Sequence, residues 1–369
     1  MIVLISSGLK VFRDFPFIGV SNLGGTIKFL TAICLLVFYA VVCADTVVPR
    51  ASVVNWLNVR EEALPGPGVP IVGHLHPGES AKFLSEVNNY FEIKLEDGTD
   101  GFVHKSWARR VAAPTIKIAT FNIQTFGKTK AGKPELMEEL ASIIREYDIV
   151  AIQEIKNKEG SVPTKFLTEI NKDGSAYTLV VSERSGLQPD DETSQEQYAY
   201  YLNTETLHII DDAGLYDDSG SDQFNREPYL ARFGVNDGNF TFALITVHTK
   251  PELAIAETKA LDDVFTWAQN QYPDEDDFIA LGDFNAACDY ARPSDFIGSP
   301  IVDDYIWIIP DDADTNVSPT EACAYDRIVI TNDATEDYAG SFGVDTSLSS
   351  NAVSDHYPVW AEFHQDQDK

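Results

Sequence analysis

The sequence places side chains capable of metal and acid–base chemistry at the ends of several strongly apolar runs. These polar residues are Asn122, Gln124, Glu154, Glu196, His248, Asp283, Asn285, Asp326, Asp355 and His356. Hard divalent cations prefer carboxylate and amide oxygens, and histidine exchanges protons near neutral pH. Each residue alone has an ordinary explanation, since Asp and Asn at strand ends are common turn residues. Together, with two histidines and several acidic partners, they indicate a metal-assisted acid–base site.

The elements that must position these groups are strands alternating with helices. The predicted strands are residues 116–123, 149–155, 177–183, 198–203, 240–249, 278–285, 324–331 and 356–363. Apolar residues recurring at spacings of three and four predict helices over 133–147 and 252–271. Continuous apolar runs within the strands indicate burial on both faces. We therefore expect a layered α/β domain over residues 116–365.

A smaller β-rich module precedes this domain, over residues 45–111. Its short alternating strands are separated by the turn sequences PGPG, HPGE and EDGTDG. Leu57–Arg60, the turn at Gly78, Tyr90–Phe91 and Gly101–His104 resemble the bacterial SH3-like domain, a small β-barrel. The resemblance implies a cell-wall or protein ligand for this module. Residues 112–115 are the expected linker.

Residues 29–44 form an uncharged apolar run of 16 positions that ends in Val42-x-Ala44. A membrane span needs about 20 such residues, so residues 1–44 are interpreted as a signal peptide. We expect a secreted or periplasmic protein, with an uncleaved anchor over 29–44 as the alternative. Cys288 and Cys323 would remain in the mature chain. In an exported protein they most simply form one disulfide, the alternative being two unrelated buried thiols.

The composition is that of a globular protein, with 44% hydrophobic and 23% charged residues. This balance excludes intrinsically disordered, fibrous and polytopic membrane proteins. The net charge of −31 also argues against a protein that holds nucleic acid by bulk charge. Nearly all of this charge falls on residues 114–369, which contain 17 basic and 48 acidic residues. A polyanionic substrate would therefore require divalent cations, and its binding would tolerate salt.

The polar motifs, taken in order, resemble those of the endonuclease/exonuclease/phosphatase superfamily. They are FNIQTFG, IQEIK, VHTKP, GDFNA and SDHYPV, between residues 116 and 363. The stretches EQY, FNREP and CAYDRI are similar to the deoxyribonuclease I branch of that superfamily. The resemblance implies a four-layer α/β sandwich of two packed mixed β-sheets flanked by helices. It also assigns Cys288 and Cys323 to the branch's long-loop disulfide.

The resemblance implies a monomeric enzyme that hydrolyses DNA phosphodiester bonds with little sequence specificity and leaves 5′-phosphates. The implied ligands of one or two Mg²⁺ (or Mn²⁺) ions are Asn122, Glu154, Asp283, Asn285 and Asp355. His356, oriented by Asp326, would be the general base, and His248, paired with Glu196, the general acid. The implied phosphate contacts are Arg226 and Lys156.

Two departures from the branch affect binding rather than chemistry. Residues 216–222 replace a small second disulfide, and we expect Asp218, Asp222 and Glu227 to hold a structural Ca²⁺, an acidic surface loop being the alternative. Residues 186–195 replace a segment that carries an Arg and a Tyr for the DNA minor groove. Here the segment is acidic and lacks an aromatic residue, so we expect it to bind double-stranded DNA more weakly.

Two other functions remain open. The same fold and chemistry could serve RNA or a phospholipid head group. Alternatively, the chain could be a non-catalytic binding protein that uses its SH3-like module. The histidine and carboxylate pairs favour the enzyme.

Overall fold

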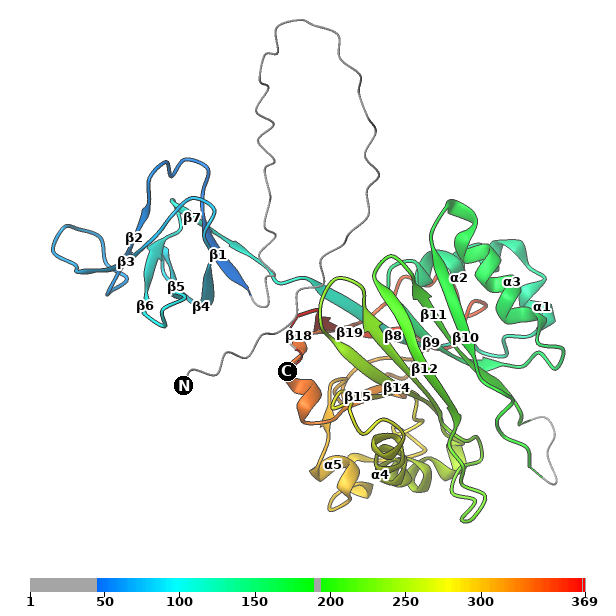
Figure 1. Ribbon diagram of the computed structural model, residues 1–369. Helices are drawn as coiled ribbons and strands as arrows, with labels where there is room; N and C mark the ends of the chain where they lie inside the picture. Colours follow the sequence, from blue (N-terminus) through cyan, green and yellow to red (C-terminus); the bar gives the residue numbers. More distant parts are fainter. Residues whose placement is uncertain (1–44, 189–193, 367, 369) are drawn as a thin grey trace, which may run out of the picture. The chain divides into compact units, whose positions relative to one another are not determined.

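The computed structural model describes residues 45–188, 194–366 and 368 (Figure 1). The expected signal peptide, residues 1–44, lies outside the described residues. So does the central part of the acidic segment 186–195. Within the described part of the chain, no helix is both long and apolar enough to cross a membrane.

Residues 46–111, called here the N-terminal module, form one seven-stranded antiparallel sheet. Its strands are β1 (Thr46–Pro49), β2 (Leu57–Arg60), β3 (Ile71–Leu75), β4 (Ala81–Val87), β5 (Tyr90–Lys94), β6 (Asp100–His104) and β7 (Ala108–Val111). They are ordered β3-β2-β6-β5-β4-β1-β7. Alternate residues point inward, and Val47, Val59, Ile93 and Val103 are fully buried.

The described residues after the N-terminal module, called here the α/β domain, contain two six-stranded sheets. The first, in the order β10-β11-β9-β8-β19-β18, contains β8 (Thr115–Asn122), β9 (Ile149–Ile155), β10 (Tyr177–Val181), β11 (Gln197–Asn203), β18 (Tyr338–Val344) and β19 (Val359–His364). The second, in the order β12-β13-β14-β15-β17-β16, contains β12 (Leu207–Leu215), β13 (Tyr229–Val235), β14 (Thr241–His248), β15 (Phe278–Asp283), β16 (Ile306–Trp307) and β17 (Asp326–Ile330). Among the described residues, only β8–β9 and β14–β15 pair in parallel, so both sheets are mixed.

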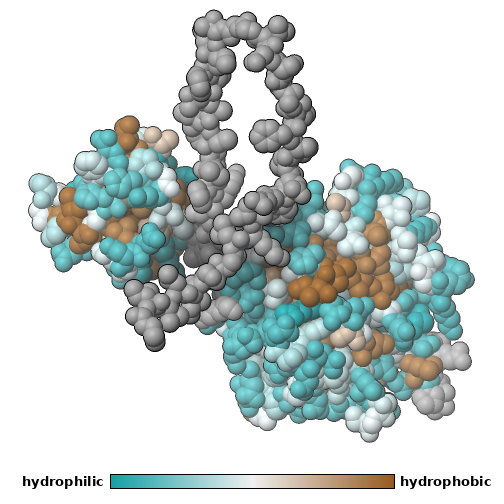
Figure 2. Space-filling model, viewed as in Figure 1, coloured by the Kyte–Doolittle hydropathy of each residue, from teal (hydrophilic) through white to brown (hydrophobic). Residues whose placement is uncertain are grey.

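Helices cover the outer face of each sheet (Figure 1). The first sheet packs against α1 (Lys128–Ala131), α2 (Pro134–Ile144) and α3 (Ser161–Ile170), and the second against α4 (Ala254–Gln271) and α5 (Pro300–Asp303). The 3₁₀ turns are η1 (Asn171–Asp173), η2 (Pro251–Leu253), η3 (Pro293–Asp295) and η4 (Asp333–Thr335). Helix, sheet, sheet and helix give four layers, which confirms the expected sandwich. The domain surface seen in Figure 2 is mainly hydrophilic, in keeping with its acidity.

All eight predicted strands and both predicted helices are present, but four longer elements were not predicted. These are β12, β13, β18 and α3. Strand β12 lies at a sheet edge and exposes most of its side chains, so it lacks an apolar run. Helix α3 contains Pro163 in its first turn, where proline is tolerated because the missing N–H needs no partner.

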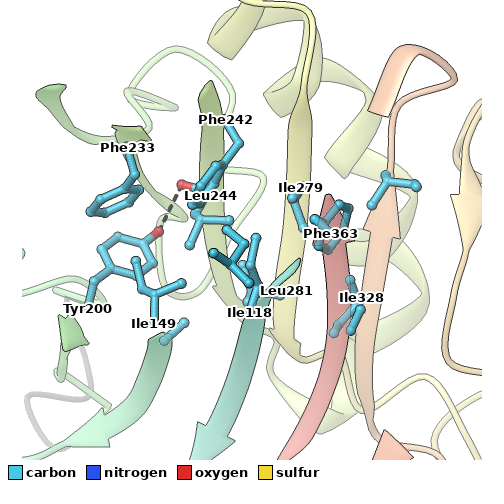
Figure 3. Close-up of a cluster of buried hydrophobic side chains, with 14 of the residues drawn as sticks. Ile118, Ile149, Tyr200, Phe233, Phe242, Leu244, Ile279, Leu281, Ile328 and Phe363 are labelled. Carbon is cyan, nitrogen blue, oxygen red and sulfur yellow. Dashed lines mark hydrogen bonds between the residues drawn. The ribbon is translucent and has the colours of Figure 1, made fainter. Parts of the chain in front are cut away.

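The core between the sheets is held by a buried polar contact as well as by apolar packing (Figure 3). The Tyr200 hydroxyl, on β11 of the first sheet, lies 2.9 Å from the carbonyl oxygen of Tyr229 and 2.8 Å from that of Leu244. Both carbonyls belong to the second sheet. The hydroxyl has one proton, so it donates to one carbonyl at a time. Tyr200 therefore ties the two sheets together inside the hydrophobic core.

We expect Tyr200→Phe to lower the free energy of unfolding by about 1 kcal/mol, because a buried carbonyl loses its donor. Urea denaturation followed by circular dichroism measures this difference. Tyr290→Phe is the matched control, since Tyr290 is 42% exposed, and it should leave the midpoint unchanged. Equal midpoints for Tyr200→Phe and the wild type would show that the hydroxyl does not stabilise the sandwich.

Candidate active site

The polar groups predicted from the sequence meet at one edge of the sandwich. Asn122, Glu154, His248 and Asp283 lie at or near the carboxyl ends of their strands. Glu196, Asp326 and His356 lie at or just before the starts of β11, β17 and β19. Each of these three strands runs antiparallel to one of the others, so its start lies beside that strand's end. Residues from both sheets thereby converge.

The central feature is a pair of histidines that share one carboxylate. Nδ1 of His248 lies 2.6 Å from Oε1 of Glu196, and Nδ1 of His356 lies 2.8 Å from Oδ2 of Asp326. The opposite ring nitrogens, both Nε2, lie 3.5 and 3.6 Å from the same atom, Oδ2 of Asp283. Each imidazole is therefore oriented by a carboxylate on one side and presents Nε2 to a common site.

Burial and charge set the protonation of this pair. Burial alone would raise the pKa of Glu196, but His248 and Arg226 outweigh it and lower the pKa to about 2. Glu196 is thus ionised. Burial likewise lowers the pKa of His356, but Asp326 and Asp283 outweigh it and raise the pKa to about 10. Without a cation, His356 is protonated at neutral pH.

The proposed metal ligands are close together, and two of their oxygens lack a donor. Nδ2 of Asn122 donates to Oδ2 of Asp283 at 3.0 Å and to Oε1 of Glu154 at 3.3 Å. Oδ1 of Asn122 and Oδ1 of Asp355 are buried and have no hydrogen-bond partner among the described residues. An unpaired buried oxygen is costly. Oxygens of this kind, next to ionised carboxylates, fit a hard divalent cation.

Neighbouring groups hold these ligands in place. The backbone N–H of Asn285 donates to Oδ1 of Asp283 at 3.0 Å, while its side-chain amide donates to the carbonyl of Thr249 at 3.1 Å. The Thr125 backbone N–H donates to Oε2 of Glu154 at 2.7 Å. Asn285 therefore orients a ligand through its backbone, and its side-chain oxygen is the atom left for a cation.

Two local backbone features make this geometry accessible. A β-bulge between β9 and β11 sets Gln153 and Glu154 opposite the single residue Tyr198, and Glu154 has φ 62°. Left-handed backbone is unfavourable for glutamate, and bulges redirect side chains beside active sites. Gly282 has φ 147°, and a Cβ there would lie 1.9 Å from the Val247 carbonyl oxygen. Glycine is thus required for β15 to pair with β14 and place Asp283 beside His248.

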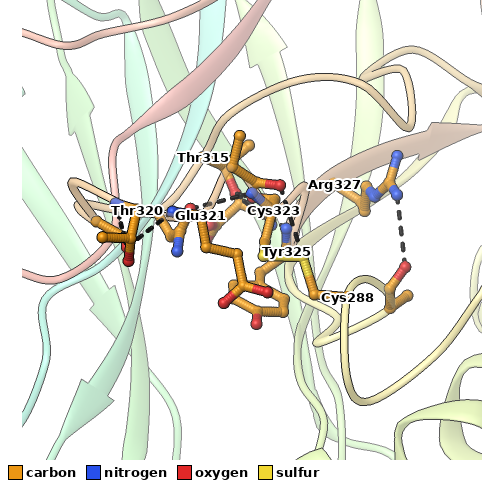
Figure 4. The surroundings of a disulfide bond; sticks show 12 residues. Cys288, Thr315, Thr320, Glu321, Cys323, Tyr325 and Arg327 are labelled. Carbon is orange, nitrogen blue, oxygen red and sulfur yellow. Dashed lines mark hydrogen bonds between the residues drawn. A yellow bond between two sulfur atoms is a disulfide. The ribbon is translucent and has the colours of Figure 1, made fainter.

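Figure 4 shows the disulfide expected between Cys288 and Cys323, which the structure confirms. Next to it, Oγ1 of the buried Thr315 donates to the Cys323 carbonyl and accepts the N–H groups of Tyr325 and Asp326, each at 3.0 Å. The crosslink and Thr315 therefore fix the start of β17, where Asp326 orients His356.

Sequence reasoning did not assign a role to Glu257 or Gln124. Glu257 is fully buried and accepts the backbone N–H groups of Asn225 and Lys250, at 2.9 and 2.7 Å. It thereby joins the loop that precedes β13 to the segment that follows His248. The sequence did contain a sign of this burial, because Glu257 lies on the apolar face of its helix together with Leu261 and Val264. Gln124 donates to Oδ2 of Asp355 at 2.6 Å.

The two expected phosphate contacts differ in their surroundings. Lys156 is 29% exposed, and its Nζ lies 3.8 Å from Oε2 of Glu196. Arg226 is only 6% exposed. Its guanidinium donates to the carbonyls of His248 and Thr249, at 3.0 and 2.9 Å. Arg226 therefore supports the backbone of His248, and its phosphate contact stays a prediction.

The three residues expected to hold Ca²⁺ do not form a ready ligand cluster. The carboxylate of Asp218 accepts the Phe224 N–H at 2.9 Å, and that of Glu227 accepts the Ser185 hydroxyl and the Gly186 N–H. In the described part of the chain, no group of ligand atoms within 4.8 Å of one another combines Asp218, Asp222 and Glu227.

The electrostatics predict an unusual titration of His356 in the metal-free protein. In EDTA its imidazole should remain protonated until the pH approaches 10, far above the ordinary value near 6.5. Mg²⁺ should lower this pKa by offsetting the carboxylate charge. Nuclear magnetic resonance of ¹⁵N-labelled histidines measures it, with His356→Gln assigning the signal. Titration near pH 6.5 in EDTA would contradict this account.

Comparisons with known proteins identify the family of this chain. The sequence profile described as the Endonuclease/Exonuclease/phosphatase family matches residues 119–356. Human deoxyribonuclease-1 is 36% identical over 272 residues, covering 67% of this chain and 92% of the relative. The pig deoxyribonuclease-1 is 35% identical over 266 residues, covering 67% and 91%. A crystal structure of an endonuclease/exonuclease/phosphatase from Bacteroides vulgatus aligns with TM-score 0.49 and 15% identity, over 68% of this chain and 99% of that one. The chain therefore belongs to the endonuclease/exonuclease/phosphatase family, with deoxyribonuclease-1 among its relatives.

Proposed function

We propose that this chain is a metal-dependent endonuclease that hydrolyses DNA phosphodiester bonds with little sequence specificity. The observation that carries the proposal is the approach of two oriented Nε2 atoms to Asp283, at 3.5 and 3.6 Å. Two proton-exchanging groups on either side of one site suit a reaction that removes one proton and delivers another. The similarity to deoxyribonuclease-1 supports DNA as the substrate.

The ligand set fits Mg²⁺ or Mn²⁺, held by Asn122, Glu154, Asp283, Asn285 and Asp355. When bound, the cation offsets negative charge on the carboxylates and on the non-bridging phosphate oxygens. The free oxygens Oδ1 of Asn122 and Oδ1 of Asp355 support this fit.

The two histidines divide the proton transfers. With less negative charge around it, His356 loses its proton and accepts one at Nε2 from the attacking water, while Asp326 holds the ring. The water oxygen bonds to phosphorus as the bond to the 3′ oxygen breaks. His248, held by Glu196, gives its Nε2 proton to that leaving oxygen. The product then carries a 5′-phosphate and a free 3′-hydroxyl.

The remaining parts of the chain complete the proposal. Residues 1–44 direct export to the periplasm or the exterior, residues 112–115 link the two folded parts, and residues 116–365 catalyse as a monomer. The N-terminal module is an SH3-like domain, a resemblance that implies a cell-wall or protein ligand. Asp218, Asp222 and Glu227 would hold a structural Ca²⁺ only after the ion draws their carboxylates together, because Asp218 and Glu227 are hydrogen-bonded to other groups in the metal-free structure.

We expect the purified protein to cut plasmid DNA when Mg²⁺ and Ca²⁺ are present and to stop in EDTA, because the carboxylates then repel the phosphate. Parallel incubations with RNA and with sphingomyelin identify the substrate class. Product end groups should be 5′-phosphates. Intact plasmid in the presence of both ions would refute the proposal, and preferential hydrolysis of RNA or lipid would reassign the substrate.

We expect His248→Ala and His356→Ala each to lower the cutting rate by about 10²-fold to 10⁴-fold, the usual contribution of general acid–base catalysis. Initial rates on plasmid measure the loss, and circular dichroism checks the fold. His208→Ala is the matched control, since His208 is an exposed histidine on β12 that bonds Asn236. A near-normal rate in either active-site variant would remove that histidine from the mechanism.

A further inference from the structure

The N-terminal module contains a pocket that the proposed chemistry does not use. Its cavity of about 510 Å³ lies within the module alone, between the loop that precedes β2, the loop that follows it, and the ends of β5 and β6. A cavity of this size is typical of ligand sites. We call it the indole pocket, because Trp56 and Trp107 both line it.

Both indoles are open to solvent, and a contact with a neighbouring ring holds Trp56 in place. Trp56 is 53% exposed and Trp107 is 52% exposed. The Trp56 ring packs edge-on against His74, with ring centroids 5.7 Å apart, and Tyr90 packs edge-on against His104 at 4.9 Å. Large aromatic side chains that remain exposed but ordered mark binding surfaces, because little conformational entropy is lost when they stack on a ligand.

The charge of the indole pocket is opposite to that of the rest of the protein. None of its lining residues, all within the described part of the chain, is acidic, although the protein carries 58 acidic residues. Arg60 lines it, and its Nη1 donates to the carbonyls of Gly66 and Val69 at 3.0 and 3.1 Å. These bonds hold the guanidinium at the rim. Planar aromatic faces next to a fixed cation suit a ligand with flat rings and negative charge.

We propose that the indole pocket binds single-stranded nucleic acid, with bases stacked on Trp56 and Trp107 and backbone phosphate near Arg60. The inference rests on the proposed function for its purpose. The α/β domain is strongly acidic, and its segment 186–195 lacks basic and aromatic residues that could bind DNA. A tethered site that retains the strand raises its local concentration at the active site.

Binding of an oligothymidylate of about 12 nucleotides, a length within the range of single-strand sites, tests the proposal. The full-length protein is titrated in EDTA, which prevents cutting, and fluorescence anisotropy of the labelled strand is followed. We expect Trp56→Ala and Trp107→Ala each to weaken binding about tenfold or more. Trp56→Phe and Trp107→Phe should retain most of the affinity, because they keep a stacking face. Leu84→Ala, at an exposed position on β4 outside the pocket, is the matched control and should bind normally.

A second measurement needs no variant. In the wild-type protein, N-bromosuccinimide oxidises exposed indoles, and peptide mapping should show that the oligonucleotide protects Trp56 and Trp107. Unchanged affinity in both alanine variants, or no protection, would overturn the proposal. Protection by a proline-rich or cell-wall peptide but not by the oligonucleotide would assign the pocket to a peptide instead. The plasmid assay separates the two proposals: cutting without protection refutes only the indole pocket, and protection without cutting refutes only the nuclease.

Discussion

A single buried carboxylate, that of Asp283, imposes the strictest constraint on this structure. The residue is 2% exposed, and one of its oxygens lies near both histidine Nε2 atoms and the Asn122 amide. A buried charge is tolerated only when donors surround it. Those donors come from both sheets, since Asn122 and His356 adjoin the first sheet and His248 the second. The active site can therefore assemble only when the two sheets pack against each other.

The fold meets this constraint with backbone that is unfavourable elsewhere. The left-handed conformation of Glu154 costs of order 1 kcal/mol or more, and Gly282 leaves a strand without a side chain to pack. Both lie at the active-site edge, while the core between the two sheets is densely apolar. Tyr200 and the Cys288–Cys323 disulfide add fixed points, one in the core and one beside Asp326. A rigid scaffold thus supports a locally strained site.

The acidity of the chain has two separate consequences. Within the site, the carboxylates raise the pKa of His356 to about 10. The proposed base therefore needs a cation nearby to lose its proton at neutral pH. Over the surface of the α/β domain, the same sign of charge repels a polyanion, and salt screens that repulsion within about 8 Å. The indole pocket of the N-terminal module carries no acidic residue. The division of charge between the two folded parts is consistent with a division of labour between cutting and holding.

Local sequence patterns were sufficient to predict the layered fold, the order of the main strands along the chain and the principal polar residues. Long apolar runs and their spacing are local properties, so β9, β14, β15 and α4 could be predicted directly. The edge strand β12 and the Pro-containing α3 could not, because their local patterns are weak. Which polar atoms meet depends on how the two sheets pack against each other. The burial of Arg226 behind His248 and the anchoring of two loops by Glu257 depend on strand register and sheet packing between residues distant in sequence. Sequence motifs can identify such residues. Which of their atoms face the substrate depends on contacts between residues distant in sequence.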